Sequence, residues 1–314
     1  MSRRVRTGQR KRSNAIYIIP ILVVVTGVVG YYIFTQSGTA GGASPLIGQP
    51  VSATVLNELS GVSMSTLNQI GKASSVNSPT ATSGGTPLTL NGKPEVLYMG
   101  AEYCPYCAAE RWAIIVAFDK FGTFTGIQYM QSSGTDVYPN TPTFTFVGAT
   151  YTSQYVSFVT VEQADRSDQP LQTATTQETS LLTTYDTGGT IPFVDIGNTY
   201  AITSSQFVPS ALRVGNVGTA APYNWTQIAS QLNNASSIPA INIDGAANRL
   251  ISAICKIDGG APSSVCSQSA AQTLSYTRTP SSSLQPLASE AILTAQAPSV
   301  SASRFAPTRF PDWV

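Results

Sequence analysis

The chain has 314 residues, of which 42% are hydrophobic and only 11% charged, less than half the charged fraction usual in soluble domains. Six of its 17 basic residues lie in the first twelve positions, so the rest of the chain carries 11 basic against 16 acidic residues. This net charge of −5 argues against a nucleic-acid partner. The length fits one ordinary domain with appendages.

An uncharged stretch, 15–35, follows the basic segment 1–14. As a helix its 21 residues would be roughly 32 Å long, enough to cross a bilayer once. The basic residues before it place the N-terminus in the cytoplasm and the remaining chain outside. The alternative is a signal peptide cleaved after Ala40, but the stretch is longer than the usual hydrophobic region of such peptides. We therefore expect a retained single-pass anchor in the cell membrane.

Beyond the anchor, the composition predicts a linker, one main domain and a tail. The linker, 36–50, is rich in Gly, Ala and Ser. The main domain, 51–274, opens with apolar spacing that predicts two short helices within 51–70. A hairpin over 87–99 follows, because Asn91-Gly92 suits a type I′ turn. The tail, 275–314, is rich in Ser, Pro and Ala, and its closing aromatic residues are candidates for docking on a partner.

The sequence Cys104-Pro105-Tyr106-Cys107 comes directly after the second strand of that hairpin and begins a helical pattern that extends to Gly122. We expect Cys104 at the N-cap and Pro105 at the first helical position, where the missing N–H costs nothing. The free amides and the positive end of the helix dipole then favour a thiolate over a thiol. The pair is therefore a candidate redox site.

The rest of the main domain mixes strand and helix patterns. Residues rich in β-branched and aromatic side chains predict strands at 126–130, 143–147 and 155–161, some of which could belong to an insertion. A polar helix is expected at 175–185, then a hairpin over 191–203 whose turn, Gly197-Asn198, we assign to type II′. Two further helices are predicted at 225–232 and 245–257.

This order of elements predicts a central sheet with helices on both faces. The segment Gly100 to Trp112, with its Cys-Pro-Tyr-Cys centre, resembles the active-site segment of the thioredoxin superfamily, including glutaredoxins and some Dsb-type periplasmic proteins. With the membrane-anchored layout, it most closely resembles an archaeal, Sulfolobus-type family of thioredoxin-like surface proteins. The resemblance covers 87–259 and implies an α/β fold, a thioredoxin-like central mixed sheet flanked by helices, with an insertion.

The resemblance also implies a cis-proline loop that faces the cysteines, and Ile191-Pro192 is the matching position. The alternative is a trans proline at the first residue of a strand. In the cis arrangement, the backbone of Ile191 would pair with an extended substrate segment. We therefore assign Ile191 and Pro192 to substrate binding.

The remaining cysteines, Cys255 and Cys266, enclose a loop rich in Gly, Pro and Ser. Outside the cell such a pair favours a structural disulfide. A zinc site is the alternative, but the chain has no histidine and the spacing of its cysteines is unusual for zinc ligands. We expect neither a metal nor a cofactor.

Two hypotheses of function follow. The first is a membrane-anchored extracytoplasmic thiol-disulfide oxidoreductase that forms or reshuffles disulfides in exported proteins, in which Cys104 exchanges with the substrate and Cys107 resolves the mixed disulfide. Its partners would be exported protein thiols or disulfides. The second is a non-catalytic thioredoxin-fold subunit of a cell-surface or membrane complex, held through the tail. Copper delivery is less favoured because no histidine is available as a ligand.

Four other side chains complete the predictions. Glu102 is expected to be a solvated carboxylate, although it could move a proton to or from Cys107. Arg111 is expected either in a surface ion pair or as a source of positive potential at the site. The sequons at Asn224 and Asn234 are candidate glycosylation sites.

Overall fold

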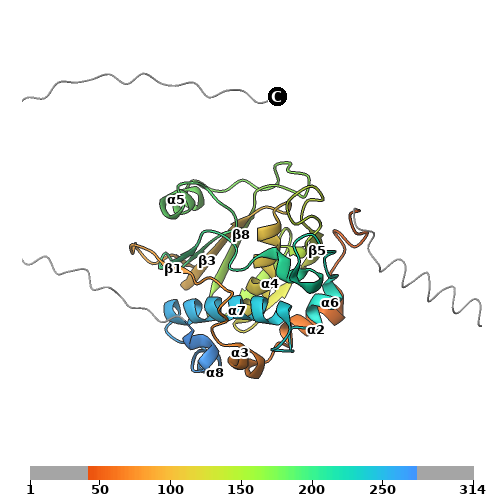
Figure 1. Cartoon of the computed structure of the whole chain (residues 1–314). Coiled ribbons are helices and arrows are strands. Elements are labelled where there is room, and N and C mark those ends of the chain that lie inside the picture. The colour runs from red at the N-terminus through yellow and green to blue at the C-terminus, as the bar shows by residue number, and fades with distance from the viewer. Residues whose placement is uncertain (1–41, 274–314) are drawn as a thin grey trace, which may run out of the picture. The chain divides into compact units, whose positions relative to one another are not determined.

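A mixed β-sheet lies at the centre of the computed structural model, which describes residues 42–273 (Figure 1). Its strand order is β1-β10-β9-β3-β2, with β8 also paired to β3. The β3–β8 pairing is parallel and the other pairings are antiparallel. The six strands are β1 (Thr80–Ala81), β2 (Thr89–Leu90), β3 (Lys93–Gly100), β8 (Ser157–Glu162), β9 (Phe193–Ile196) and β10 (Tyr200–Ile202).

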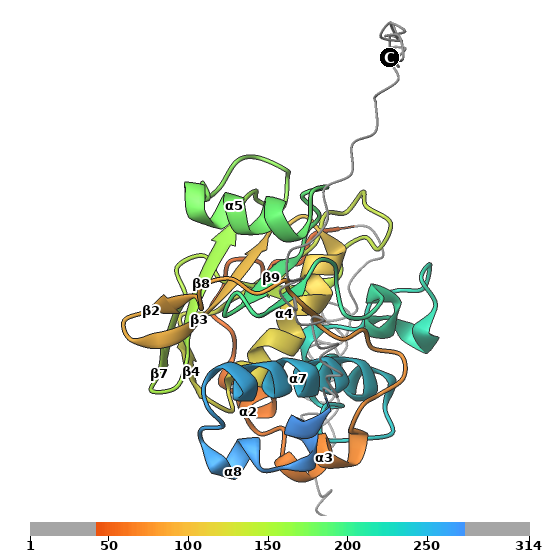
Figure 2. The same ribbon diagram turned by 90° about the vertical axis from the view of Figure 1, so that its left-hand side faces the viewer.

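Helices cover both faces of this sheet (Figure 2). On one face, Leu182 of α5 packs in a core cluster with Leu97, Met99 and Phe193 of the sheet. On the other face, α4 and α7 pack against each other. Because β3 is covered from both sides, its apolar run is continuous rather than alternating. The three helices are α4 (Pro105–Phe118), α5 (Thr176–Tyr185) and α7 (Ile238–Ile257).

Seven shorter helices complete the described part of the fold, and three of them begin at a polar side chain. Ser52, Ser63 and Asn224 accept backbone N–H groups at the starts of α2, α3 and α6. The two helices predicted within 51–70 are present as α2 and α3. The smaller helices are α2 (Ala53–Ser60), α3 (Met64–Ile70), α6 (Trp225–Ala229), α8 (Ser263–Cys266) and the 3₁₀ turns η1 (Pro209–Leu212), η2 (Val214–Asn216) and η3 (Ser269–Gln272).

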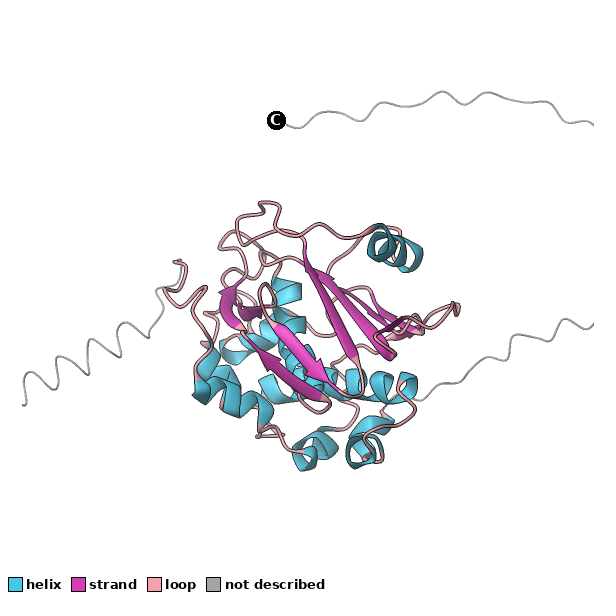
Figure 3. Cartoon of the chain, turned by 180° about the vertical axis from the view of Figure 1, so that it is seen from behind, coloured by secondary structure: helices cyan, strands magenta, loops and turns pink. Residues whose placement is uncertain are grey.

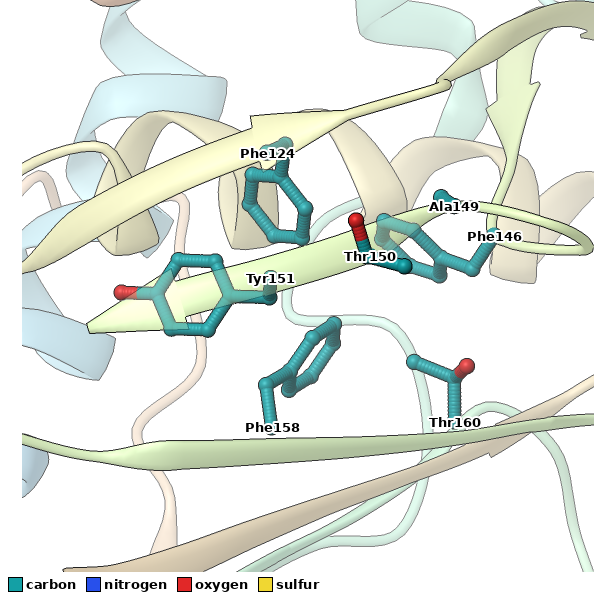
Figure 4. Close-up of a pocket in the computed structure, with 7 residues that line it drawn as sticks. All are labelled: Phe124, Phe146, Ala149, Thr150, Tyr151, Phe158 and Thr160. Atoms are coloured by element: carbon teal, nitrogen blue, oxygen red, sulfur yellow. The ribbon is translucent and has the colours of Figure 1, made fainter.

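The chain between α4 and β8 forms two separate two-stranded sheets, seen among the magenta strands of Figure 3. Rings of Phe124, Tyr151 and Phe158 face one another around a cavity of about 30 Å³ (Figure 4). These aromatic contacts join the two-stranded sheet of β4 and β7 to the central sheet through β8. The four strands are β4 (Gly122–Thr125), β5 (Gln128–Gln131), β6 (Pro142–Thr145) and β7 (Thr150–Ser153).

Several predicted boundaries were wrong. The helix after the cysteines ends at Phe118, because Gly122 already belongs to β4, which pairs with β7. Helix α7 begins at Ile238, seven residues before the predicted start, because Ser237 caps it and Pro239 suits its first turn. Helix α6 ends at Ala229 rather than at residue 232.

The turns of both predicted hairpins have positive φ at each central residue. Asn91 and Gly92 do so between β2 and β3, as a type I′ turn requires. Gly197 and Asn198 do so between β9 and β10, with φ of 64° and 54°. The assignment of this second turn to type II′ was therefore wrong, because a type II′ turn has positive φ only at the first central residue.

Part of the predicted linker is ordered against the domain. The backbone N–H of Gly48 donates to Tyr129, and the N–H of Tyr129 donates to Gln49. Ser44 N–H also donates to the Gln131 side chain. Residues 44–50 thus cover the edge of β5, which would otherwise present unpaired backbone groups. Within 42–273 no helix combines the length and the apolarity that a membrane crossing requires. The predicted anchor, 15–35, and the tail, 275–314, lie outside the described residues.

Candidate active site

The start of α4 carries a pair of free cysteines. Cys104 occupies the N-cap and Pro105 the first turn, as predicted. The Cys107 backbone N–H donates to the Cys104 sulfur over 3.3 Å. Cys104 is 6% exposed, whereas Cys107 is completely buried. The two thiols therefore differ in access to an incoming partner, with Cys104 the nearer to solvent.

The surroundings of the two cysteines shift their pKa values in opposite directions. The hydrogen bond from the Cys107 thiol lowers the pKa of Cys104 to about 7, against the opposing effect of burial. The backbone amides of Cys107 and Tyr106 and the charge of Arg111 add to this lowering. Burial raises the pKa of Cys107 well above its usual value, and the neighbouring Cys104 raises it further. Cys104 is thus the thiol that ionises more readily, and Cys107 is the proton donor of the pair.

The loop before β9 faces these sulfurs. The carbonyl oxygen of Ile191 lies 3.9 Å from the Cys104 sulfur, and the Ile191–Pro192 peptide bond is cis. The antiparallel pairing of β9 with β3 brings the loop to the cysteines, since Phe193 at the start of β9 lies opposite Met99 near the end of β3. The structure therefore brings Ile191 to the cysteine pair, although Ile191 follows Cys104 by 87 positions in the sequence.

Glu102 and Arg111 are both buried, which corrects the solvated carboxylate expected at Glu102 and rules out the surface ion pair, one of the two alternatives for Arg111. Glu102 is 5% exposed, and burial raises its pKa. Arg111 is completely buried and forms a two-point ion pair with Glu162, so it is not part of a surface pair. The sequence pointed to no partner for Arg111, because Glu162 follows it by 51 positions. The parallel register that sets Glu162 beside Gly100 brings the two side chains together.

A polar cleft opens beside Tyr103, the residue before Cys104. Its volume is about 650 Å³, and its walls come from the loop between β5 and β6 and the loop after β8. The Ser133 N–H donates to the Tyr103 carbonyl, and Arg166 donates to Asn140, so the cysteine loop and both walls are joined. The cleft was missed in the sequence because its walls come from segments about thirty positions apart. Its lining includes Ser133, Thr135, Asp136, Arg166 and Asp168.

The other predicted sites lie away from this centre. Cys255 at the end of α7 and Cys266 in α8 form a disulfide. Asn224 caps α6 through its side-chain oxygen, and Asn234 is exposed. Within the described part of the chain, no three His, Cys, Asp or Glu side chains come together as metal ligands would.

The fold and the site define a mixed α/β protein that presents a free Cys-x-x-Cys pair at the N-terminus of a buried helix. The chain belongs to the family described as "Domain of unknown function (DUF929)", whose model matches residues 80–256. No curated protein and no solved structure matches the chain. The matched region contains Cys104, Cys107 and the Ile191–Pro192 loop, and it ends one residue after Cys255.

Proposed function

We propose that this chain is a thiol-disulfide oxidoreductase with a thioredoxin-like domain. The observation that carries the proposal is a pair of free cysteines at one helix start, where the surroundings lower the pKa of one thiol and raise the pKa of the other. The arrangement around them is also consistent with a thioredoxin-like domain, since β3, α4 and β8 form a parallel crossover and β9 and β10 an antiparallel hairpin. Helices lie on both faces of the sheet, as the resemblance implies.

In the oxidised form, a substrate thiolate attacks the Cys104 sulfur of the Cys104–Cys107 disulfide. The disulfide breaks, a mixed disulfide forms with Cys104, and Cys107 leaves as a thiolate that takes up a proton. A second substrate thiolate then attacks the substrate sulfur of the mixed disulfide and releases Cys104 as its thiolate. The substrate loses two electrons and the pair gains them. A disulfide of another molecule restores the pair by the reverse exchange.

Reshuffling uses the same atoms from the reduced form. The Cys104 thiolate attacks a substrate disulfide, and the displaced substrate thiolate is free to attack elsewhere. If that rearrangement stalls, Cys107 attacks Cys104 and releases the substrate in reduced form. The low pKa of Cys104 supports its role as the group displaced from the mixed disulfide, because a more acidic thiol leaves more readily.

Exported proteins are the proposed substrates. The uncharged stretch 15–35 and the disulfide Cys255–Cys266 both support an anchored domain outside the membrane, where disulfides persist. An extended substrate segment would pair with the backbone at Ile191, beside Cys104. The polar cleft beside Tyr103 offers space for the part of the substrate chain that continues beyond this segment.

A trapping experiment on the full-length chain, purified in detergent, tests this function. A protein with scrambled disulfides is the substrate, and acid quenching with thiol alkylation preserves the intermediates. The Cys107→Ser variant should accumulate a mixed disulfide through Cys104, because it lacks the resolving thiol. The matched Cys104→Ser variant should form none, since its remaining thiol is completely buried.

The outcome that contradicts the proposal is a wild-type pair that neither exchanges with glutathione nor forms a mixed disulfide in the Cys107→Ser variant. The small exposure of Cys104 favours the second hypothesis, a static bridge in a non-catalytic subunit. Purification of the chain with a membrane partner in fixed ratio, together with an inert pair, would support that hypothesis.

A further inference from the structure

A buried cation lies one helical turn beyond the resolving cysteine. Arg111 follows Cys107 by four positions on α4, a spacing that sets two side chains about 5–6 Å apart at their Cβ atoms. We propose that Arg111, oriented by Glu162, is a positioning residue that fixes a permanent positive charge beside Cys104 and Cys107 and favours the reduced pair with Cys104 as the thiolate. The inference deepens the proposed thiol exchange and rests on it.

Glu162 fixes the orientation of the guanidinium group. The Arg111 Nε donates to Glu162 Oε1 over 2.8 Å, and Nη2 donates to Oε2 over 2.6 Å. Both side chains have no exposed surface. A two-point pair of this kind holds the planar group in one geometry. Since Glu162 ends β8 and Arg111 lies on α4, the pair also joins the central sheet to the cysteine helix.

The same guanidinium reaches the loop that carries Cys104. Arg111 Nη2 donates to the carbonyl oxygen of Ala101 over 2.8 Å, and that oxygen also accepts the backbone N–H of Cys104 over 3.3 Å. The backbone of Ala101 also helps to lower the pKa of Cys107, against the larger effect of burial. Ala101 is thus the point at which Arg111 contacts the backbone that positions both sulfurs.

One donor of the group remains available. Arg111 Nη1 is buried and has no hydrogen-bond partner among the described residues. A purely structural ion pair would gain from satisfying this donor, because a buried N–H without a partner costs free energy. The positive charge of the guanidinium would stabilise a thiolate or a leaving sulfur beside it, and the fold would not have to rearrange.

Other titratable groups face the cysteines from each surrounding element. Tyr98 comes from β3, with its ring centroid 5.7 Å from the Arg111 guanidinium carbon, and burial raises its pKa well above the usual value. Glu102 in the loop also has a pKa raised by burial. Burial likewise raises the pKa of Tyr103 and Tyr106, which flank Cys104.

Arg111 and Glu162 act on the thiols with opposite sign. The charge of Arg111 lowers the pKa of both cysteines. The anionic Glu162 opposes this by repulsion, although it also orients the arginine. Removing each charge in turn should therefore move the Cys104 titration in opposite directions. A pair that only holds the fold together would not produce this reversal.

The test compares four variants of the full-length chain in detergent, after circular dichroism has verified their fold. Glu162→Gln removes the anion, and Glu162→Gln with Arg111→Met removes both charges and leaves neither partner alone. Arg111→Lys keeps the charge. Lys93→Met is the matched control, because Lys93 lies at the far end of β3, roughly 20 Å from the cysteines. The readouts are the ultraviolet absorbance of the thiolate against pH and the equilibrium with glutathione.

We expect Glu162→Gln to raise the acid dissociation constant of Cys104 several-fold. Adding Arg111→Met should lower it several-fold below the single variant and shift the glutathione equilibrium toward the disulfide, since a less stable thiolate makes a weaker oxidant. Arg111→Lys should retain most of the wild-type acidity, and Lys93→Met should change nothing.

The inference would be overturned if Cys104 has the same acid dissociation constant in Glu162→Gln as in the double variant with Arg111→Met. If the double variant does not fold, an unchanged or lowered acid dissociation constant in Glu162→Gln alone overturns it. These titrations use no protein substrate. A chain that titrates as expected but never forms a mixed disulfide would therefore contradict the proposed function and not the role of Arg111.

Discussion

Replacing Glu110 by Gln should change how the stability of this protein depends on pH. Glu110 lies on α4 and has no exposed surface. Its Oε2 atom accepts the backbone N–H of Gln206 over 2.9 Å, and Oε1 has no hydrogen-bond partner among the described residues. Burial is the main cause that raises the pKa of Glu110 from 4.5 to about 7.

The direction of the effect follows from proton binding. Between pH 4.5 and about 7 the folded protein keeps a proton on Glu110 that the unfolded chain has lost. The free energy of unfolding therefore falls as pH rises through this window, and it is unaffected by Glu110 below and above it. Each tenfold difference in proton affinity is worth about 1.4 kcal/mol, so Glu110 accounts for a loss of about 3 kcal/mol.

The measurement is urea unfolding of the full-length chain from pH 4.5 to 7.5, with wild type and Glu110→Gln side by side. Glutamine resembles the protonated carboxyl and keeps an oxygen for the Gln206 N–H. Asp119 and Asp195, whose pKa values burial raises to about 7 and about 6, give the wild type further loss in the same direction. The difference between the two proteins isolates Glu110.

From the acidic to the alkaline end of the pH range, the free energy of unfolding of the variant should rise by about 3 kcal/mol relative to that of wild type. Glu58→Gln removes a carboxylate from a solvent-accessible position of α2 and is the matched control. A difference between Glu110→Gln and wild type that stays constant with pH would refute the reasoning, because it would mean that Glu110 titrates alike in the folded and unfolded chains.

Two further predictions concern stability. Replacing Cys255 and Cys266 together by Ala should lower the free energy of unfolding by about 3 kcal/mol, the value for a closed loop with this separation of 11 positions; urea unfolding that matches the oxidised wild type would contradict this. Gly100→Ala should cost about 1–3 kcal/mol through overpacking, because its Cβ would lie 2.1 Å from the hydroxyl oxygen of the buried Tyr98. Thermal unfolding measures the loss, and an unchanged midpoint would show that Tyr98 can move aside.

Local signals in the sequence predicted the cysteine centre well. The order strand, Cys104, Pro105 and helix requires only neighbouring residues, so the N-cap was predictable. The first hairpin was predictable for the same reason, because Asn91-Gly92 adopts positive φ at both positions. The second hairpin was placed correctly, but its turn type depended on the conformation of Asn198, which lies in the left-handed region. Asparagine tolerates this region but also adopts others, so the residue type alone did not decide the turn type.

The surroundings of the charged side chains near the cysteines could not be predicted from neighbouring residues. Glu102 was expected to be solvated, and a surface ion pair was one of the two alternatives for Arg111, because charged residues are usually exposed. Their burial depends on β8 pairing in parallel with β3 and on the insertion covering the cysteine loop. Neither the pairing nor the cover has a signal within a few residues of Glu102 or Arg111. The cleft beside Tyr103 was missed for the same reason.

By itself, the sequence determined where the reactive pair begins its helix, where the chain turns back in hairpins, and which cysteines lie far enough apart to close a stabilising loop. These features depend on interactions between neighbouring residues. Only the tertiary structure decided that Arg111 meets Glu162 in a fully buried pair and that burial raises the pKa of Cys107 while the pKa of Cys104 is lowered. The reason is physical: burial and charge at a site come from strands and loops that are distant in sequence and are brought together only by the pairing of the sheet.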